Sequence, residues 1–91
     1  MDKSLYSRVN IVLCSLLRKL RKEYGHNQSH IAKHMNWPQS YVSRYESGER
    51  RIDPVELYFI CDAIGISFKE FATRYESALQ DKKFLQHSHY S

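Results

Sequence analysis

Four polar residues near the middle of the sequence have side chains suited to hydrogen bonding with the edges of base pairs: Gln39, Ser40, Ser43 and Arg44. Their spacing places all four on one face of a helix. A glutamine amide can bond N6 and N7 of adenine together, and an arginine guanidinium can bond O6 and N7 of guanine. The alternative interpretation is an ordinary solvated helix face. The helices that position these four residues therefore decide between a base-reading face and an ordinary solvated face.

Two short helices joined by a tight turn are predicted between Gln28 and Ser47. Helical spacing on either side of a break gives the inward-facing set: Ile31, Ala32, Met35, Trp37, Val42 and Tyr45. Ala32 is small enough for a second helix to cross closely, and Asn36 tolerates the left-handed conformation that a turn needs. Pro38 suits the first turn of the second helix. These features at these spacings predict a helix-turn-helix.

This stretch and its flanks resemble the phage repressor and Cro type of helix-turn-helix regulators, the Xre-like family. The resemblance covers roughly residues 16–71 and is carried by three segments: LRKLRKEYG (17–25), NQSHIA (27–32) and PQSYVSRYESGERR (38–51). His26 departs from the family, which usually has an aliphatic residue there, and this weakens the expected apolar contact with Ile31. Asn36 stands where the family usually has glycine.

The resemblance implies specific roles for five residues. It places base contacts at Gln39, Ser40 and Arg44. It also implies a structural ion pair between Arg21 and Glu46, which would hold the second helix of the motif rather than touch DNA. Truncating one partner of such a pair would then affect stability more than DNA contact.

A further set of residues is expected to contact phosphates and fix the docking register: Asn27, Gln28, Tyr41, Ser43, Arg50 and Arg51. Asn27 is predicted to cap a helix that begins at Gln28. The free backbone N–H groups at the N-terminus of this helix form an anion-binding site. Tyr41 is expected to pack part of its ring and leave its hydroxyl for a phosphate. For Arg50 or Arg51 taken singly, a solvated loop arginine is an equally good interpretation.

The whole chain is predicted to be all-α, a repressor-like domain of five helices near residues 4–24, 28–35, 38–46, 54–64 and 68–78. We expect one domain over residues 1–79 and a mobile tail over 80–91. The helix near 54–64 is expected to bury Val55, Leu57, Tyr58, Cys61 and Ile64. The last helix carries Phe68, Phe71, Ala72, Tyr75 and Leu79 as core or dimer candidates.

Charge is distributed unevenly along the chain. Residues 1–51 contain ten Lys and Arg against four Asp and Glu, a net of +6, whereas residues 52–91 contain four against six, a net of −2. This asymmetry suggests one face directed at a polyanion. The two cysteines, Cys14 and Cys61, are expected to be small core residues rather than a disulfide. No secretory or membrane segment is predicted, so we expect a cytoplasmic protein.

Three histidines, His26, His30 and His34, are spaced four apart along the first helix of the motif. Two histidines at this spacing can bind zinc, but structural zinc needs four ligands, and no Cys, Asp or Glu near them in the sequence completes a set. We therefore expect no metal. A solvated histidine face near the phosphates is the favoured interpretation, with binding that tightens as pH falls through about 6.5.

Catalysis is not expected, because no nucleophile is paired with a histidine and an acid, no carboxylates are paired, and no glycine-rich loop is present. No cofactor or small-molecule site is expected either. The predicted function is sequence-specific binding of duplex DNA by a bacterial or phage transcriptional regulator, as a homodimer on a two-fold operator. The alternative is a non-catalytic, protein-binding adaptor on the same fold, antitoxin-like or polymerase-binding, with a toxin or a polymerase subunit as its partner. Such an adaptor would more typically display a contiguous apolar patch.

Overall fold

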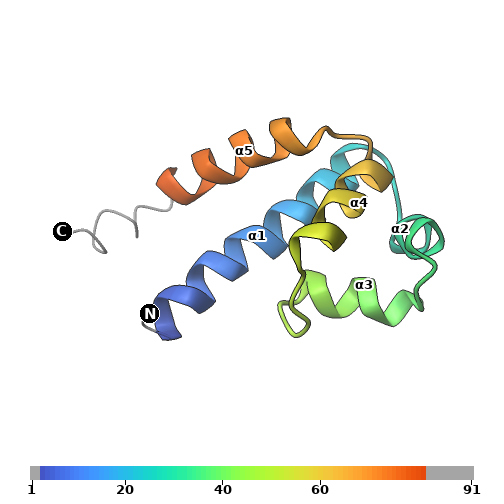
Figure 1. Ribbon diagram of the computed structural model, residues 1–91, viewed down its shortest axis with the longest axis horizontal. Coiled ribbons are helices and arrows are strands. Elements are labelled where there is room, and N and C mark those ends of the chain that lie inside the picture. The colour runs from blue at the N-terminus through green and yellow to red at the C-terminus, as the bar shows by residue number, and fades with distance from the viewer. Residues whose placement is uncertain (1–2, 82–91) are drawn as a thin grey trace.

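Five α-helices and no strand make up residues 3–81, the part of the chain that the computed structural model describes. In order they are α1 (Lys3–Glu23), α2 (Gln28–Met35), α3 (Gln39–Glu46), α4 (Pro54–Ile64) and α5 (Phe68–Asp81). The predicted all-α class is confirmed. In Figure 1, α1 and α5 run along each other, while α2, α3 and α4 are grouped beside the C-terminal half of α1.

The helix boundaries follow the predicted local signals with small differences. Helices α2 and α4 have the predicted bounds, and α3 begins one residue late because Pro38 is its N-cap, with an extended ψ of 145°. Helix α5 continues to Asp81, so Gln80 and Asp81 are helical rather than part of a tail. The remainder of the predicted tail, residues 82–91, lies outside the described residues.

One apolar core joins the five helices. Tyr45 and Phe71 are the largest side chains buried in it, and both are almost fully inaccessible to solvent. Helices α1 and α5 are further joined by the Tyr75 hydroxyl, which donates a hydrogen bond of 3.0 Å to the carbonyl of Val9. The other large members of this core are Leu17, Leu20, Ile31, Val42, Ile60 and Ile64.

The predicted inner face of α4 is partly wrong. Val55 and Tyr58 are exposed by 65% and 55%, whereas Ile60, which was not predicted to face inward, is fully buried. Nearly every residue from Val55 to Cys61 is apolar, so helical periodicity alone does not select one face. Phe68 was a core or dimer candidate, and it too is exposed, by 40%.

The turn of the helix-turn-helix depends on a left-handed residue. Asn36 has φ 57° and ψ 45°, and the N–H of Trp37 donates to the carbonyl of Ala32 at 2.9 Å. Every other described residue with positive φ is a glycine. The turn is therefore closed by backbone bonds that require this conformation.

We expect Asn36→Ala to lower the free energy of unfolding by about 1 kcal/mol, since a Cβ without a local polar partner disfavours this region. Asn36→Gly is the matched control and should be neutral or stabilising. Urea unfolding of the two variants checks the difference. Equal stability of both would show that the backbone at Asn36 is not strained.

Candidate nucleic-acid interface

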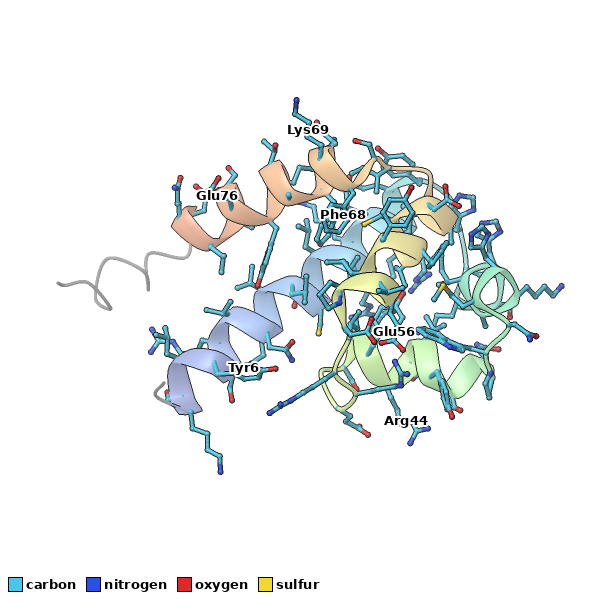
Figure 2. All side chains as sticks on the ribbon, in the orientation of Figure 1. Tyr6, Arg44, Glu56, Phe68, Lys69 and Glu76 are labelled. Carbon is cyan, nitrogen blue, oxygen red and sulfur yellow. The ribbon has the colours of Figure 1, made fainter. Side chains whose placement is uncertain are left out.

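The predicted recognition face is exposed on α3. Gln39, Ser40, Ser43 and Arg44 all face solvent. On the opposite side of the same helix, Val42 and Tyr45 are fully buried. Arg44 projects away from the protein at its outer edge (Figure 2). Helix α3 thus exposes polar side chains on one face while its opposite, apolar face is buried in the core.

An ion pair fixes the C-terminal end of α3 to α1. The Arg21 Nε and Nη2 atoms donate to the two carboxylate oxygens of Glu46 at 2.6 and 3.0 Å, and both side chains are more than nine-tenths buried. Arg21 Nη1 also donates to the carbonyl of His26 at 2.9 Å. The hydrogen bond to Glu46 raises the pKa of the Arg21 guanidinium. A bidentate, buried pair of this kind fixes orientation as well as distance.

The Glu46 carboxylate also begins a chain of hydrogen bonds that ends at Gln39, on the exposed polar face of α3. Gln28 Nε2 donates to Glu46 Oε1 at 3.1 Å, and Gln39 Nε2 donates to Gln28 Oε1 at 3.4 Å. Ser29 Oγ donates to Gln39 Oε1 at 3.2 Å. Gln39 is therefore held by two residues of α2 before any ligand binds. This arrangement was not predicted from the sequence, because it joins residues of two helices.

Gln28→Ala should weaken discrimination at the base that Gln39 contacts, by up to about tenfold, because an amide held in advance loses less entropy on binding. Stability should change little, since the Arg21–Glu46 bonds remain. Affinities for duplexes that differ at this base pair check the expectation. Lys33→Ala, at an exposed position of the same helix, is the control. Unchanged discrimination in Gln28→Ala would mean that Gln28 does not position Gln39.

The residues expected to contact phosphates differ in how accessible the structure leaves them. Ser43 and Arg51 are exposed, and Tyr41 is half-buried with its ring 5.8 Å from that of Trp37. The Asn27 side chain caps α2 by accepting from the His30 N–H at 2.9 Å, so only its amide nitrogen and the nearby backbone N–H groups remain for a phosphate.

For Arg50 the structure favours a structural role over the predicted phosphate contact. Its guanidinium lies 4.7 Å from the ring centre of Trp37 and 4.8 Å from that of Tyr41. Its Nη2 pairs with Glu56 at 3.0 Å, with both side chains about three-quarters buried. Through its cation–π contacts and its partly buried ion pair, Arg50 joins the loop after α3 to the turn before α3 and to α4. Arg51, by contrast, lies over the exposed ring of Tyr6 at 4.6 Å.

Two of the three histidines, His30 and His34, contact α4, which the sequence did not indicate, although both remain exposed to solvent. His26 stacks on His30 with ring centres 3.9 Å apart, and His30 Nε2 lies 2.8 Å from the carbonyl of Ala63. His34 Nε2 lies 3.1 Å from Asp62 Oδ2, a carboxylate that is distant in sequence and was missed. Residues 3–81 contain no group of three or more side chains able to hold a metal ion.

The cysteine thiols and the apolar character of the helices bear on thiol chemistry and on membrane insertion. Cys14 and Cys61 are buried free thiols, and burial raises the pKa of Cys61 to about 12, which makes it a poor nucleophile. Among the described helices, none is long and apolar enough to cross a membrane.

Comparison with known proteins agrees with the geometry of α2 and α3. A helix-turn-helix family model matches residues 17–71, which include both helices, the turn and α4. The chain belongs to the helix-turn-helix family. An uncharacterised HTH-type transcriptional regulator of Sinorhizobium fredii, y4dJ, is 33% identical over 55 residues, which are 60% of this chain and 71% of that protein.

Among solved structures, an XRE-family like protein from Pseudomonas syringae pv. tomato is similar to this chain. It superposes with a TM-score of 0.76 at 31% sequence identity, covering 82% of this chain and 92% of the other. The chain is thus an Xre-like helix-turn-helix protein, a DNA-binding regulator of transcription, as the resemblance implied. Proteins of this class act by binding and generally carry out no catalysis.

Proposed function

We propose that this helix-turn-helix protein binds specific duplex sequences by inserting α3 into the major groove, as a homodimer on a two-fold operator. The observation that carries the proposal is the exposed face of Gln39, Ser40, Ser43 and Arg44 on a helix whose other side is buried. Recognition requires side chains held in advance, because their free rotation would otherwise be lost on binding. The Arg21–Glu46 pair and the Gln28–Gln39 contact support that requirement.

The proposed roles divide into base recognition and positioning. Gln39 and Arg44 form bidentate bonds to adenine and guanine, and Ser40 makes a shorter-range contact. Phosphates are bound on either side by the N-terminus of α2, by Ser43 and Tyr41, and by Arg51 in the loop after α3. The net charge of +6 on residues 1–51 attracts the duplex over a longer range.

A two-fold operator follows from dimer symmetry. Two copies present their α3 helices about 34 Å apart, one turn of B-DNA, to successive major grooves on one side of the duplex. Each half-site then has the same sequence in opposite orientation. Such a protein works in the bacterial or phage-infected cytoplasm, where its effect on transcription depends on operator position.

Selection of bound sites from random duplexes, at a stated salt concentration, tests this proposal. We expect a motif of two inverted half-sites with centres separated by about 10 base pairs. Enrichment of one half-site alone would support recognition by α3 but contradict the two-fold operator. If no sequence were enriched, the proposal would be overturned.

An adaptor function is the second candidate, because one observation favours it. Exposed apolar side chains are gathered on α4 and at the start of α5, where a partner protein would find a contiguous patch. The exposed face of α3 is polar, however, so the patch and the recognition face are separate surfaces. Absence of any sequence preference in the wild-type protein would favour the adaptor function.

A further inference from the structure

Aromatic and cationic side chains alternate between the turn before α3 and the exposed face of that helix. The Arg50 guanidinium lies 4.7 Å from the ring centre of Trp37 and 4.8 Å from that of Tyr41. The Arg44 guanidinium lies 5.4 Å from the centre of the same Tyr41 ring. All three distances are within the range of about 6 Å over which a ring face attracts a cation. We call Trp37, Arg50, Tyr41 and Arg44 the cation–π ladder.

The Arg50 end of the cation–π ladder is fixed within the fold. Arg50 Nη2 pairs with Glu56 at 3.0 Å, and each of the two side chains is only about one-quarter exposed. Arg50 Nη1 is buried and has no hydrogen-bond partner in residues 3–81, so the neighbouring rings are what stabilises that side of the guanidinium. The Tyr41 ring is also 5.8 Å from that of Trp37. Tyr41 therefore has two neighbours that restrict the movement of its ring.

The Arg44 end of the ladder is open to a ligand. Arg44 is exposed and projects from the edge of the molecule (Figure 2). Within the part of the chain that the structure describes, its guanidinium forms no hydrogen bond or ion pair. A cation–π contact engages the charge of a guanidinium and leaves its N–H donors available. Tyr41 can therefore orient Arg44 without occupying the donors that would bond guanine O6 and N7.

We propose that Tyr41 is a positioning residue, whose ring holds Arg44 in the orientation that recognises guanine, and that Arg50 restricts this ring. The inference rests on the proposed function, since it adds to the base contact of Arg44 the residues that determine how well that contact discriminates. It also separates two parts of Tyr41: the hydroxyl contacts a phosphate, and the ring acts on Arg44. A long side chain that is held before binding loses less entropy on the DNA.

Site selection with Tyr41→Leu tests the role of the ring. Leucine keeps an apolar side chain at this half-buried position but has no π face. We expect the preference for guanine at the Arg44 base pair to fall by roughly three- to tenfold. The preference at the base pair of Gln39 should not change, because Gln39 is held by Gln28 and Ser29. Equal relaxation at both base pairs would mean that the substitution displaces α3, and would overturn the positioning role.

Tyr41→Phe is the matched control, because it keeps the ring and removes the hydroxyl. It should retain the wild-type preference at both base pairs while binding all duplexes more weakly, by roughly tenfold or less, as expected for one lost hydrogen bond. A loss of guanine preference equal to that of Tyr41→Leu would assign the effect to the hydroxyl and overturn the proposal. Tyr41→Met replaces Tyr41→Leu if circular dichroism shows that the latter does not fold.

Arg50→Lys tests whether Arg50 restricts the ring. A lysine ammonium can still pair with Glu56, but it lacks the planar guanidinium that lies near both Trp37 and Tyr41. The guanine preference should fall in the same direction as in Tyr41→Leu, and by a smaller factor. An unchanged preference would contradict the part of the proposal that gives Arg50 this role.

A measurement on the free protein separates this inference from the proposed function. NMR relaxation of the Arg44 Nε–H group reports its motion on the picosecond to nanosecond timescale. The order parameter should be lower in Tyr41→Leu than in the wild-type protein and in Tyr41→Phe. That result in a protein without sequence preference would leave the Tyr41–Arg44 contact standing and contradict the DNA function. If Arg44→Ala removed the guanine preference while Tyr41→Leu changed neither preference nor order, the function would stand and the positioning role would be overturned.

Discussion

Replacing Arg21 with alanine is expected to lower the free energy of unfolding by about 3–5 kcal/mol. The loss is large because Glu46 would remain buried, with its side chain 3% exposed, and without its bidentate partner. For a chain of this size the melting temperature should fall by more than about 10 °C. Thermal and urea unfolding followed by circular dichroism measure both quantities.

Lys19→Ala is the matched control for Arg21→Ala. Lys19 also lies on α1 and pairs with a glutamate, Glu23, but at 4.0 Å and with its side chain 71% exposed. Its removal should cost well under 1 kcal/mol. The double variant Arg21→Met with Glu46→Leu should recover much of the lost stability. If Arg21→Ala kept the wild-type melting temperature and abolished DNA binding, Arg21 would be a DNA contact rather than a structural residue.

Arg44→Ala should flatten the selected motif at one base pair in each half-site, with a loss of about 1–3 kcal/mol of discrimination there. The reason is that Arg44 is exposed at the outer edge of α3, where a bidentate contact with guanine is available. Stability should change little, since the contact that Arg44 loses is an exposed cation–π contact, with its guanidinium 5.4 Å from the centre of the Tyr41 ring. Site selection with the folded variant shows the effect directly.

Arg51→Ala is the comparison for Arg44→Ala. Arg51 is exposed in the loop after α3 and is proposed to contact a phosphate. Its loss should leave the motif intact, weaken binding to all sequences alike, and reduce the salt dependence by about one ion. Titrations at several salt concentrations measure that slope. Full discrimination by Arg44→Ala would show that α3 does not recognise bases through this residue.

Helix boundaries were predictable because local chemistry determines them. Asn27 caps α2 through its side chain, and Asp53 forms a reciprocal capping box with Glu56 at the start of α4, as its Asp-Pro-Val-Glu sequence indicates. The turn at Asn36 was predictable for the same reason. Each of these features involves residues close together in the sequence, so no tertiary contact is needed to infer them.

Contacts between residues distant in sequence were not predictable from the residues alone. The Arg21–Glu46 pair was expected only through the family resemblance, and the approach of Asp62 to His34 from another helix has no sequence signal. Arg50 and Glu56 are only six residues apart, but their pairing depends on the path of the loop between α3 and α4. The face of α4 was ambiguous because it is apolar on nearly all sides, and the choice between Tyr58 and Ile60 as the buried residue depends on how α2 and α5 pack. The exposed polar face of α3 was predictable because the polar and apolar residues of this helix follow helical periodicity.

The proposed recognition of a specific DNA sequence by α3 is tested by a comparison of two affinities. The affinity of the wild-type protein is compared between a selected duplex and a shuffled duplex of the same composition, at a fixed physiological salt concentration. We expect a ratio of about 10³ or more, typical of sequence-specific regulators. A ratio within a few-fold of one would contradict the claim, and α3 would then have another role.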